Sequence, residues 1–383
     1  MMRIDCLFID PFNNCKSGVT QYTLLCHKFL LNQGKKSYIL NKNMDESLEA
    51  FCQRIASFVD QNDIQEIEAP ETLACTRYVQ HENIHIRLHL SRQVGRYLQG
   101  FNIDYDAVAV EQREIDRAKY LSAPSCIALE VSQKIFNIDG CYVYPNPVDM
   151  TLIYENYSKI DSNAIDVSKQ KIYFIARGES LKGIVFLEIF KFFESSLICI
   201  GDKKLELFLK KNNFSIPFLS GEDREHTVLP KCNDIIIVPS LFETWSMVGV
   251  EGLTNFARVV TWEHLGFCEF FDNDCLSKVE FPNSEHFIMK IQEVTNKPFS
   301  SIDKAKVLEN IESVHAQFIM GVERRVMNIE WVCNNASVLN EIKKVAIRAK
   351  KDRFRALLRK LFSHPLLFWH DSKLGQTWKK FIK

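Results

Sequence analysis

Short apolar runs of strand length alternate with amphipathic helical patterns through most of the chain, and this alternation constrains the fold more than any other feature. The runs expected to form strands are residues 3–9, 37–40, 64–68, 83–88, 126–130, 141–144, 171–176, 197–201, 217–219, 234–238 and 258–261. Helical patterns lie between them, at residues 18–32, 45–60, 91–98, 183–194, 204–211 and 246–255. Strands that alternate with helices form parallel sheets covered on both faces, so the sequence predicts an α/β protein.

The chain of 383 residues is long enough to bury two hydrophobic cores. The first series of strands ends around residues 145–147, and the polar stretch that follows is typical of a linker. After about residue 303 the pattern becomes helical to the end. We therefore predict a first α/β domain at residues 1–155, a second at 156–342 that includes returning helices, and a tail at 343–383, with a cleft between the two domains.

The tail carries a charge of +11, whereas the rest of the chain carries −11, although the net charge is zero. Its first part has the pattern of an amphipathic helix, and aromatic side chains follow among more lysines. Basic and aromatic side chains together favour an anionic membrane surface, where each cation adds about 1 kcal/mol. The residues expected at that surface are Arg348, Lys351, Arg355, Arg359 and Trp369. The alternative is a solvated helix whose apolar stripe packs on the body of the protein.

Several classes of protein are disfavoured by the sequence. No apolar run is long enough to span a membrane, and an acidic residue stands where a signal peptide would be apolar. The 12 cysteines are scattered without a metal-ligand rhythm, so we expect reduced thiols in the cytoplasm, no disulfides and no structural zinc. Nucleic acid is not an expected partner, because the acidic body would repel phosphates.

Two loops that follow expected strands carry candidate binding residues. After residues 171–176 come Arg177 and Lys182, two cations with glycines beside them, which could grip a diphosphate or could simply be solvated. After residues 234–238 come Glu243 and then Glu251, which lies about one turn into the next expected helix. The positive end of that helix, near Ser246, would face the cleft.

These motifs, taken in order, resemble the retaining glycosyltransferases of family 4, which have the GT-B fold of two Rossmann-like domains facing a cleft. The residues that carry the resemblance are Ser17-Gly18, Pro145-Asn146-Pro147-Val148-Asp149, Arg177-x4-Lys182-Gly183, Gly201-Asp202 and Glu243-x7-Glu251. The likeness covers roughly residues 3 to 340. The chain departs from the family at Pro147, where glycine is usual, and at residues 256–260, where the family has Gly-x-Pro-Val-Val.

The resemblance implies roles for individual residues. Arg177 and Lys182 would neutralise the leaving diphosphate, Glu243 would contact the transferred sugar, and Glu251 would hold the ribose. The donor site would also include Gly18, Ser246, Met247 and Val248. His89, at the end of the strand expected at 83–88, matches a histidine placed beside the sugar, and the alternative is a strand-end histidine with a solvent or backbone partner. His85 and Arg87 alternate with Ile86 and Leu88, so they would point to the face of the sheet opposite to those two apolar residues.

The expected function is therefore a retaining, metal-independent hexosyltransferase with a nucleotide-sugar donor and no cofactor. The segment 361–372 also resembles tails of bacterial capsule and lipopolysaccharide glycosyltransferases, which implies a glycan or lipid-linked acceptor at the inner face of the cytoplasmic membrane. Two alternatives remain at this stage: a catalytically silent GT-B scaffold of a membrane assembly, and a nucleotide-sugar epimerase.

Overall fold

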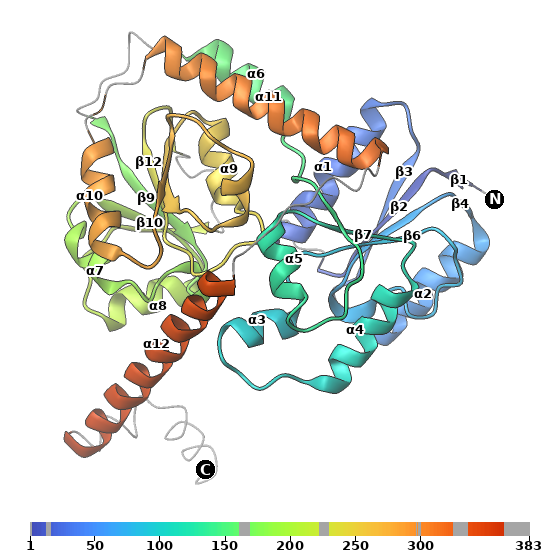
Figure 1. Cartoon of the computed structure of the whole chain (residues 1–383), viewed down its shortest axis with the longest axis horizontal. Helices are drawn as coiled ribbons and strands as arrows, with labels where there is room; N and C mark the ends of the chain where they lie inside the picture. Colours follow the sequence, from blue (N-terminus) through green and yellow to red (C-terminus); the bar gives the residue numbers. More distant parts are fainter. Residues whose placement is uncertain are drawn as a thin grey trace.

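The structure of the protein is a computed structural model that describes residues 2–12, 17–160, 169–221, 230–295, 297, 300–324 and 336–363. It contains two separate six-stranded sheets in which every strand pair is parallel, and helices cover both sheets (Figure 1). The predicted α/β class with two parallel sheets is confirmed.

The first sheet has the strand order β3-β2-β5-β6-β7-β8. Its strands are β2 (Cys6–Asp10), β3 (Ser37–Asn41), β5 (Ile67–Pro70), β6 (Ile84–Arg87), β7 (Tyr120–Ala123) and β8 (Tyr142–Val143). Its helices are α1 (Gly18–Asn32), α2 (Leu48–Gln61), α3 (Arg92–Leu98), α4 (Tyr105–Arg117) and α5 (Cys126–Ser132). A small parallel pair, β1 (Arg3–Ile4) and β4 (Asp63–Ile64), lies beside it.

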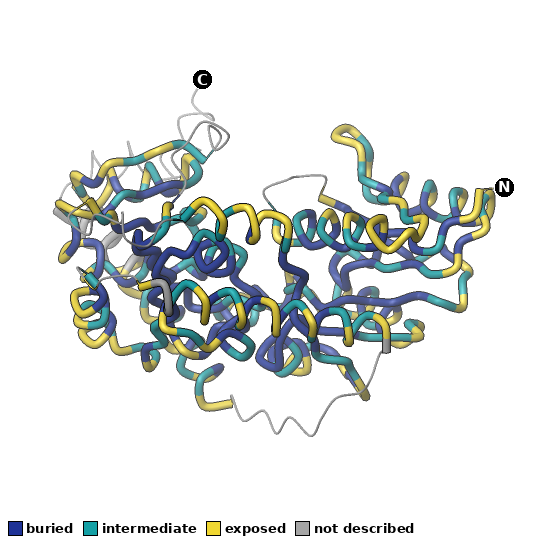
Figure 2. The backbone as a smooth tube through the Cα atoms, turned by 90° about the horizontal axis from the view of Figure 1, so that it is seen from above, coloured by how far each residue is buried: buried dark blue, intermediate teal, exposed yellow. Residues whose placement is uncertain are grey.

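The second sheet has the strand order β11-β10-β9-β12-β13-β14, which is the doubly wound order of a Rossmann fold. Its strands are β9 (Ile172–Ala176), β10 (Leu197–Gly201), β11 (Phe218–Ser220), β12 (Ile235–Val238), β13 (Arg258–Trp262) and β14 (Leu276–Val279). Its helices are α7 (Leu187–Phe192), α8 (Lys203–Lys211), α9 (Met247–Thr254) and α10 (Ser284–Val294). The buried backbone runs through the middle of each domain, and the exposed segments lie mainly on the outer helices (Figure 2).

One predicted strand is wrong. Residues 126–130 belong to helix α5, and the strand in this region is β7, which the sequence reading missed. The Ser125 side chain accepts a hydrogen bond from the Ala128 amide, so Ser125 caps the helix at the end of an apolar run. A short apolar run with a serine before it fits a buried helix as well as a strand. Helices α4 and α10, strand β14 and helix α6 (Met150–Lys159) were also not expected from the sequence.

Three helices connect the two domains. Helix α6 packs against α9 and against α11 (Ser301–Arg324), and α11 runs across both domains (Figure 1). Phe318 of α11 is fully buried in a cluster with residues of the first domain, among them Phe8, Tyr22 and Tyr144. Helix α12 (Ala336–Ser363) starts against α3, and its far end projects away from the body. The expected boundaries at 155 and 343 fall inside α6 and α12.

Candidate active site at the switch point of the second sheet

Strands β9 and β12 pair with each other at the centre of the second sheet, where the strand order reverses. Ligands of open α/β sheets bind at such a switch point, beyond the carboxyl ends of the strands. The two loops singled out in the sequence leave from these two strands. The Leu241 amide donates a hydrogen bond of 2.8 Å to the Leu181 carbonyl, so the two loops lie side by side.

Lys182 and Glu243 form an ion pair between these loops. The Lys182 ammonium donates to both carboxylate oxygens of Glu243 at 2.7 Å, and the Ser240 hydroxyl donates to the same carboxylate at 3.0 Å. The Lys182 side chain is 25% exposed and that of Glu243 is 14% exposed. The ion pair is therefore largely buried but still accessible to a ligand.

Arg177 does not share this setting. Its side chain is 61% exposed, and its guanidinium lies 3.6 Å from the Glu179 carboxylate. Lys204 of α8 lies 3.7 Å from the other oxygen of Glu179. In this structure Arg177 therefore points toward solvent, whereas Lys182 faces Glu243.

Glycine is required at two positions of the first loop. Gly183 has a φ of +86°, and a Cβ atom there would lie 2.1 Å from the Pro239 carbonyl oxygen. A Cβ atom on Gly178 would lie 2.3 Å from the Leu205 amide nitrogen at the start of α8. The missing side chains let this loop pack directly on the backbone of its neighbours, which fixes the position of Lys182.

The start of helix α9 lies directly after Glu243. The buried Ser246 side chain accepts a hydrogen bond from the Gly249 amide at 3.2 Å and so caps the helix. Met247 and Val248 are partly exposed in the first turn, and Glu251 is partly exposed in the second. The structure thus places Ser246, Met247 and Val248 at the start of α9 and Glu251 in its middle, all close in the chain to the ion pair.

His89 lies just beyond the carboxyl end of β6 in the first domain. Its ring packs edge-on against Tyr22, with 4.9 Å between the ring centres. Burial, helped by the Arg87 guanidinium, lowers the pKa of His89 to about 3, so the imidazole is neutral near pH 7. The Thr244 hydroxyl donates to the His89 carbonyl at 2.8 Å, and this contact brings His89 to the loop that carries Glu243.

The amides of His89 and Leu90 donate to the carboxylate of Glu71, at 2.8 and 2.9 Å. Glu71 is fully buried just after β5, and burial raises its pKa to about 7. Glu71 was not predicted from the sequence, because the role of a glutamate that follows a strand cannot be recognised before its hydrogen-bond partners are known. This carboxyl group holds the backbone that carries His89.

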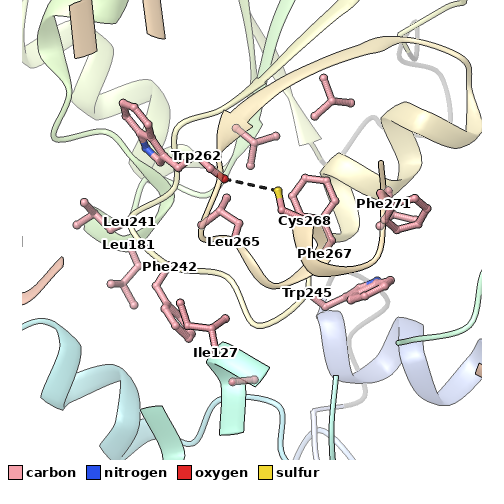
Figure 3. Close-up of a cluster of buried hydrophobic side chains, with 14 of the residues drawn as sticks. Ile127, Leu181, Leu241, Phe242, Trp245, Trp262, Leu265, Phe267, Cys268 and Phe271 are labelled. Atoms are coloured by element: carbon pink, nitrogen blue, oxygen red, sulfur yellow. Dashed lines mark hydrogen bonds between the residues drawn. The ribbon is translucent and has the colours of Figure 1, made fainter. Parts of the chain in front are cut away.

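Contacts between the domains close the seam beside the site. The Glu269 carboxylate accepts from the amides of Cys126 and Ile127 at the start of α5, at 2.7 and 2.9 Å. The Ser125 hydroxyl donates to the Thr244 carbonyl at 2.7 Å. Below these polar contacts the seam is apolar, and Ile127 of the first domain lies next to Phe242 of the second (Figure 3). The sequence reading also missed Glu269.

Comparison with solved structures identifies the fold of the chain. No protein-family model and no curated protein matches the chain. A sucrose-phosphate synthase from Thermosynechococcus elongatus superposes with a TM-score of 0.62 and 13% identity, over 92% of this chain and 100% of that chain. A glycosyltransferase from Rickettsia africae gives 0.58 and 15%, over 89% and 98%. The lipopolysaccharide outer core galactosyltransferase WaaB gives 0.53 and 11%, over 85% and 100%.

The chain has the GT-B fold. Similarity over nearly the whole length of both chains in each pair, together with the two parallel sheets, confirms the fold expected from the sequence. At these identities the likeness establishes the fold alone.

Departures from the expected GT-B pattern have local explanations. Phe256 stands where glycine was expected, and it adopts a φ of +57° with its side chain fully buried. Packing of that ring against Tyr157 holds a backbone conformation that glycine would adopt more easily. Gly18 is the exposed first residue of α1, and a Cβ atom there would meet nothing within 4 Å. Gly18 therefore has no steric requirement in this structure.

Part of the predicted membrane tail lies within the described residues. Arg348, Lys351 and Arg355 are exposed on α12. Arg359 belongs to the same helix, but its side chain is outside the described part, and so is Trp369 altogether. In the part that the structure describes, no helix is both long and apolar enough to span a bilayer.

Proposed function

We propose that this protein is a retaining, metal-independent glycosyltransferase that takes a nucleotide-sugar donor at the Lys182–Glu243 site. The observation that carries the proposal is the bidentate ion pair at the switch point of a GT-B fold, next to the start of α9. Several GT-B neighbours bear the names of glycosyltransferases, and one, an α-glucosyltransferase, was solved with UDP. A UDP-sugar is therefore the first donor to test.

Breaking a sugar–phosphate bond builds negative charge on the departing diphosphate. Catalysis then depends on groups that bind this charge more tightly in the transition state than in the ground state. Lys182 would exchange one charged partner, the Glu243 carboxylate, for the phosphate. The amides at the start of α9 would add further donors to the same group.

Glu243, released from Lys182, would accept hydrogen bonds from hydroxyls of the transferred sugar. Glu251 would do the same for the ribose, in line with the family resemblance. The neutral His89 would contribute a hydrogen bond and no charge at the opposite wall of the crevice. Arg177 would join the diphosphate only after leaving Glu179, so we assign it a smaller part than Lys182.

The assignment is tested with Lys182→Ala and Glu243→Ala. Each variant should lose transfer by about 100- to 1000-fold, the range seen when one donor to a developing oxyanion is removed. Lys211→Ala and Glu293→Ala are matched controls, because they remove the same charges from exposed positions in the last turns of α8 and α10. Each site variant should still unfold cooperatively, at a lower temperature than the unchanged protein, because one partner of a largely buried ion pair is left without its counter-charge. Full activity of both site variants would refute the site.

The donor is found first by a thermal-shift screen of nucleotide sugars, because a ligand that binds the native state raises its unfolding temperature. Transfer of labelled sugar to an acceptor supports the proposal. Conversion of the donor without any acceptor would indicate an epimerase instead, and binding without turnover would indicate a silent scaffold.

We further propose that the acceptor is a bacterial surface glycan, either capsule or lipopolysaccharide, built at the inner face of the membrane, where α12 holds the enzyme. Lys343 and Lys350 lie over the rings of Tyr97 and Phe101 in the first domain, at 4.0 and 4.3 Å. The exposed side chains of Arg348, Lys351 and Arg355 remain available to anionic lipid.

Binding to the membrane is tested with vesicles that contain anionic lipid. The triple charge reversal of Arg348, Lys351 and Arg355 to Glu should abolish sedimentation with these vesicles and leave the contacts of α12 with the first domain in place. A triple reversal of Lys203, Lys210 and Lys211 on α8 is the control. Equal sedimentation of both triple variants would contradict the assignment of α12.

A further inference from the structure

A histidine and two glutamates meet on one face of the first sheet, away from the Lys182–Glu243 pair. Glu66 and Glu68 lie two residues apart at the start of β5, so their side chains share a face. His85 of β6 stands directly opposite Glu68 in the parallel register. One ligand atom from each of the three residues lies within 4.8 Å of the others. This cluster could not be predicted from the sequence, because its members come from two strands, with Glu68 and His85 17 residues apart.

The spacing suits one small cation. The Nδ1 atom of His85 lies 3.0 Å from Oε2 of Glu68 and 3.8 Å from Oε1 of Glu66. In a tetrahedral zinc site with bonds of 2.0–2.1 Å, neighbouring ligand atoms are about 3.3 Å apart. The two carboxylates lie no more than 4.8 Å apart at their nearest ligand atoms, so side-chain shifts of about 1 Å would place all three atoms around one ion.

Two buried polar atoms in the cluster lack hydrogen bonds. The His85 side chain is only 4% exposed, and its Nδ1 atom lies 3.0 Å from the Glu68 carboxylate without a well-aligned hydrogen bond. The Oε1 atom of Glu68 is also buried without a hydrogen-bond partner. Buried polar atoms nearly always have partners, so both atoms call for an explanation. A bound cation would supply one for the His85 Nδ1 atom, and it would also supply one for Oε1 of Glu68 if that carboxylate bound with both oxygens.

The His85 ring has, at its second nitrogen, Nε2, the kind of hydrogen bond that orients metal-binding histidines. Its Nε2 atom lies 2.7 Å from the Ser122 hydroxyl, which also accepts a hydrogen bond from Arg87 at 3.0 Å. A ligating histidine usually donates its second N–H to an oxygen in this way, and that bond sets the tautomer and the ring orientation. Glu66 is 25% exposed, which leaves the ion a route from solvent.

We propose that Glu66, Glu68 and His85 bind one first-row divalent cation, with zinc the best match and water completing the shell. An imidazole with two carboxylates is a borderline donor set that suits zinc, cobalt or manganese better than calcium. The ligands lie near the beginnings of β5 and β6, whereas His89 and the Lys182–Glu243 pair follow the carboxyl ends of β6, β9 and β12. The ion therefore has a structural role that joins β5 to β6, and this proposal stands independently of the proposed glycosyltransferase activity.

The test uses the full chain without an affinity tag. After treatment with chelator, the protein is dialysed against zinc, manganese or cobalt, and the metal content is measured by mass spectrometry. We expect one zinc ion per chain, a rise in unfolding temperature when zinc is added, and visible absorption bands typical of four-coordinate cobalt. Absence of stoichiometric binding with all three metals would overturn the proposal.

Variants separate this site from adventitious binding. Glu66→Gln and Glu68→Gln should weaken zinc binding by at least about 100-fold, and Ser122→Ala by about 10- to 100-fold. Glu82→Gln and His81→Gln, in the same domain but outside the cluster, should bind zinc as the unchanged chain does. Glu66→Gln provides the reading if Glu68→Gln does not fold, because Glu66 is the more exposed of the two. Equal affinity in Glu66→Gln and Glu82→Gln would place the metal elsewhere.

Discussion

The buried carboxyl group of Glu71 should make the stability of the protein depend on pH. Glu71 is fully buried, and its side chain accepts the amides of His89 and Leu90. Burial raises its pKa from 4.5 to about 7, and the charge of the neighbouring Glu111 acts in the same direction. The perturbation that tests this is Glu71→Gln, which keeps the shape and one acceptor oxygen but cannot ionise.

The sign and the size follow from the two pKa values. Between pH 4.5 and 7 the folded chain holds a proton on Glu71 that the unfolded chain has released. The bound proton therefore adds its whole contribution to the free energy of unfolding below pH 4.5, and this contribution is lost as the pH rises through 7. A difference of 2.5 pH units between 4.5 and about 7 amounts to about 3 kcal/mol.

Urea unfolding at pH 5 and at pH 8 measures this term. His89 contributes with the opposite sign, because its lowered pKa makes stability fall as the pH drops below 6.5. That contribution is common to the unchanged protein and to Glu71→Gln, so it cancels in their difference. The difference between the two free energies of unfolding should move by about 2.5 kcal/mol in favour of the variant from pH 5 to pH 8, because part of the term is already lost at pH 5. A difference that stays constant between these pH values would refute the reasoning.

Two further substitutions test the loop and the seam. Gly183→Ala should lower the free energy of unfolding by more than Gly34→Ala does. Both glycines have a positive φ, but only at Gly183 would the added Cβ atom lie 2.1 Å from a carbonyl oxygen. The positive φ alone should cost each variant about 1–2 kcal/mol, and equal losses in urea unfolding would contradict the packing argument. Glu269→Gln should destabilise the protein by about 1.5–3 kcal/mol and speed proteolysis at the seam, because a charged acceptor of two amides is lost. Glu263→Gln, an exposed neighbour, should change neither measurement, and matching behaviour of the two variants would show that the seam does not depend on Glu269.

The sequence predicts those features that depend on local pattern. The helix expected at residues 18–32 is α1, and the strands expected at 171–176 and 197–201 are β9 and β10 to within a residue. The loops with Lys182 and Glu243 were found because each follows a strongly apolar strand. Residues 126–130 were misassigned because a short buried helix and a short buried strand have the same apolar content.

The remaining features depend on contacts between distant segments. Glu71 meets the His89 amide 18 residues away, and Glu269 meets α5 more than 140 residues away. The partners of a carboxylate cannot be read from its neighbours in the chain. The exposure of Arg177 has the same origin, because Glu179 and α8 set the direction of its side chain.

The position of Phe318 has a consequence for how the chain can be divided. This ring comes from α11, far beyond the second sheet, yet it is fully buried beside Phe8, Tyr22 and Tyr144 of the first domain. A fragment that ended at residue 155 would expose that aromatic surface to water and would tend to aggregate. We therefore expect the first domain to complete its native packing only when synthesis has passed residue 318.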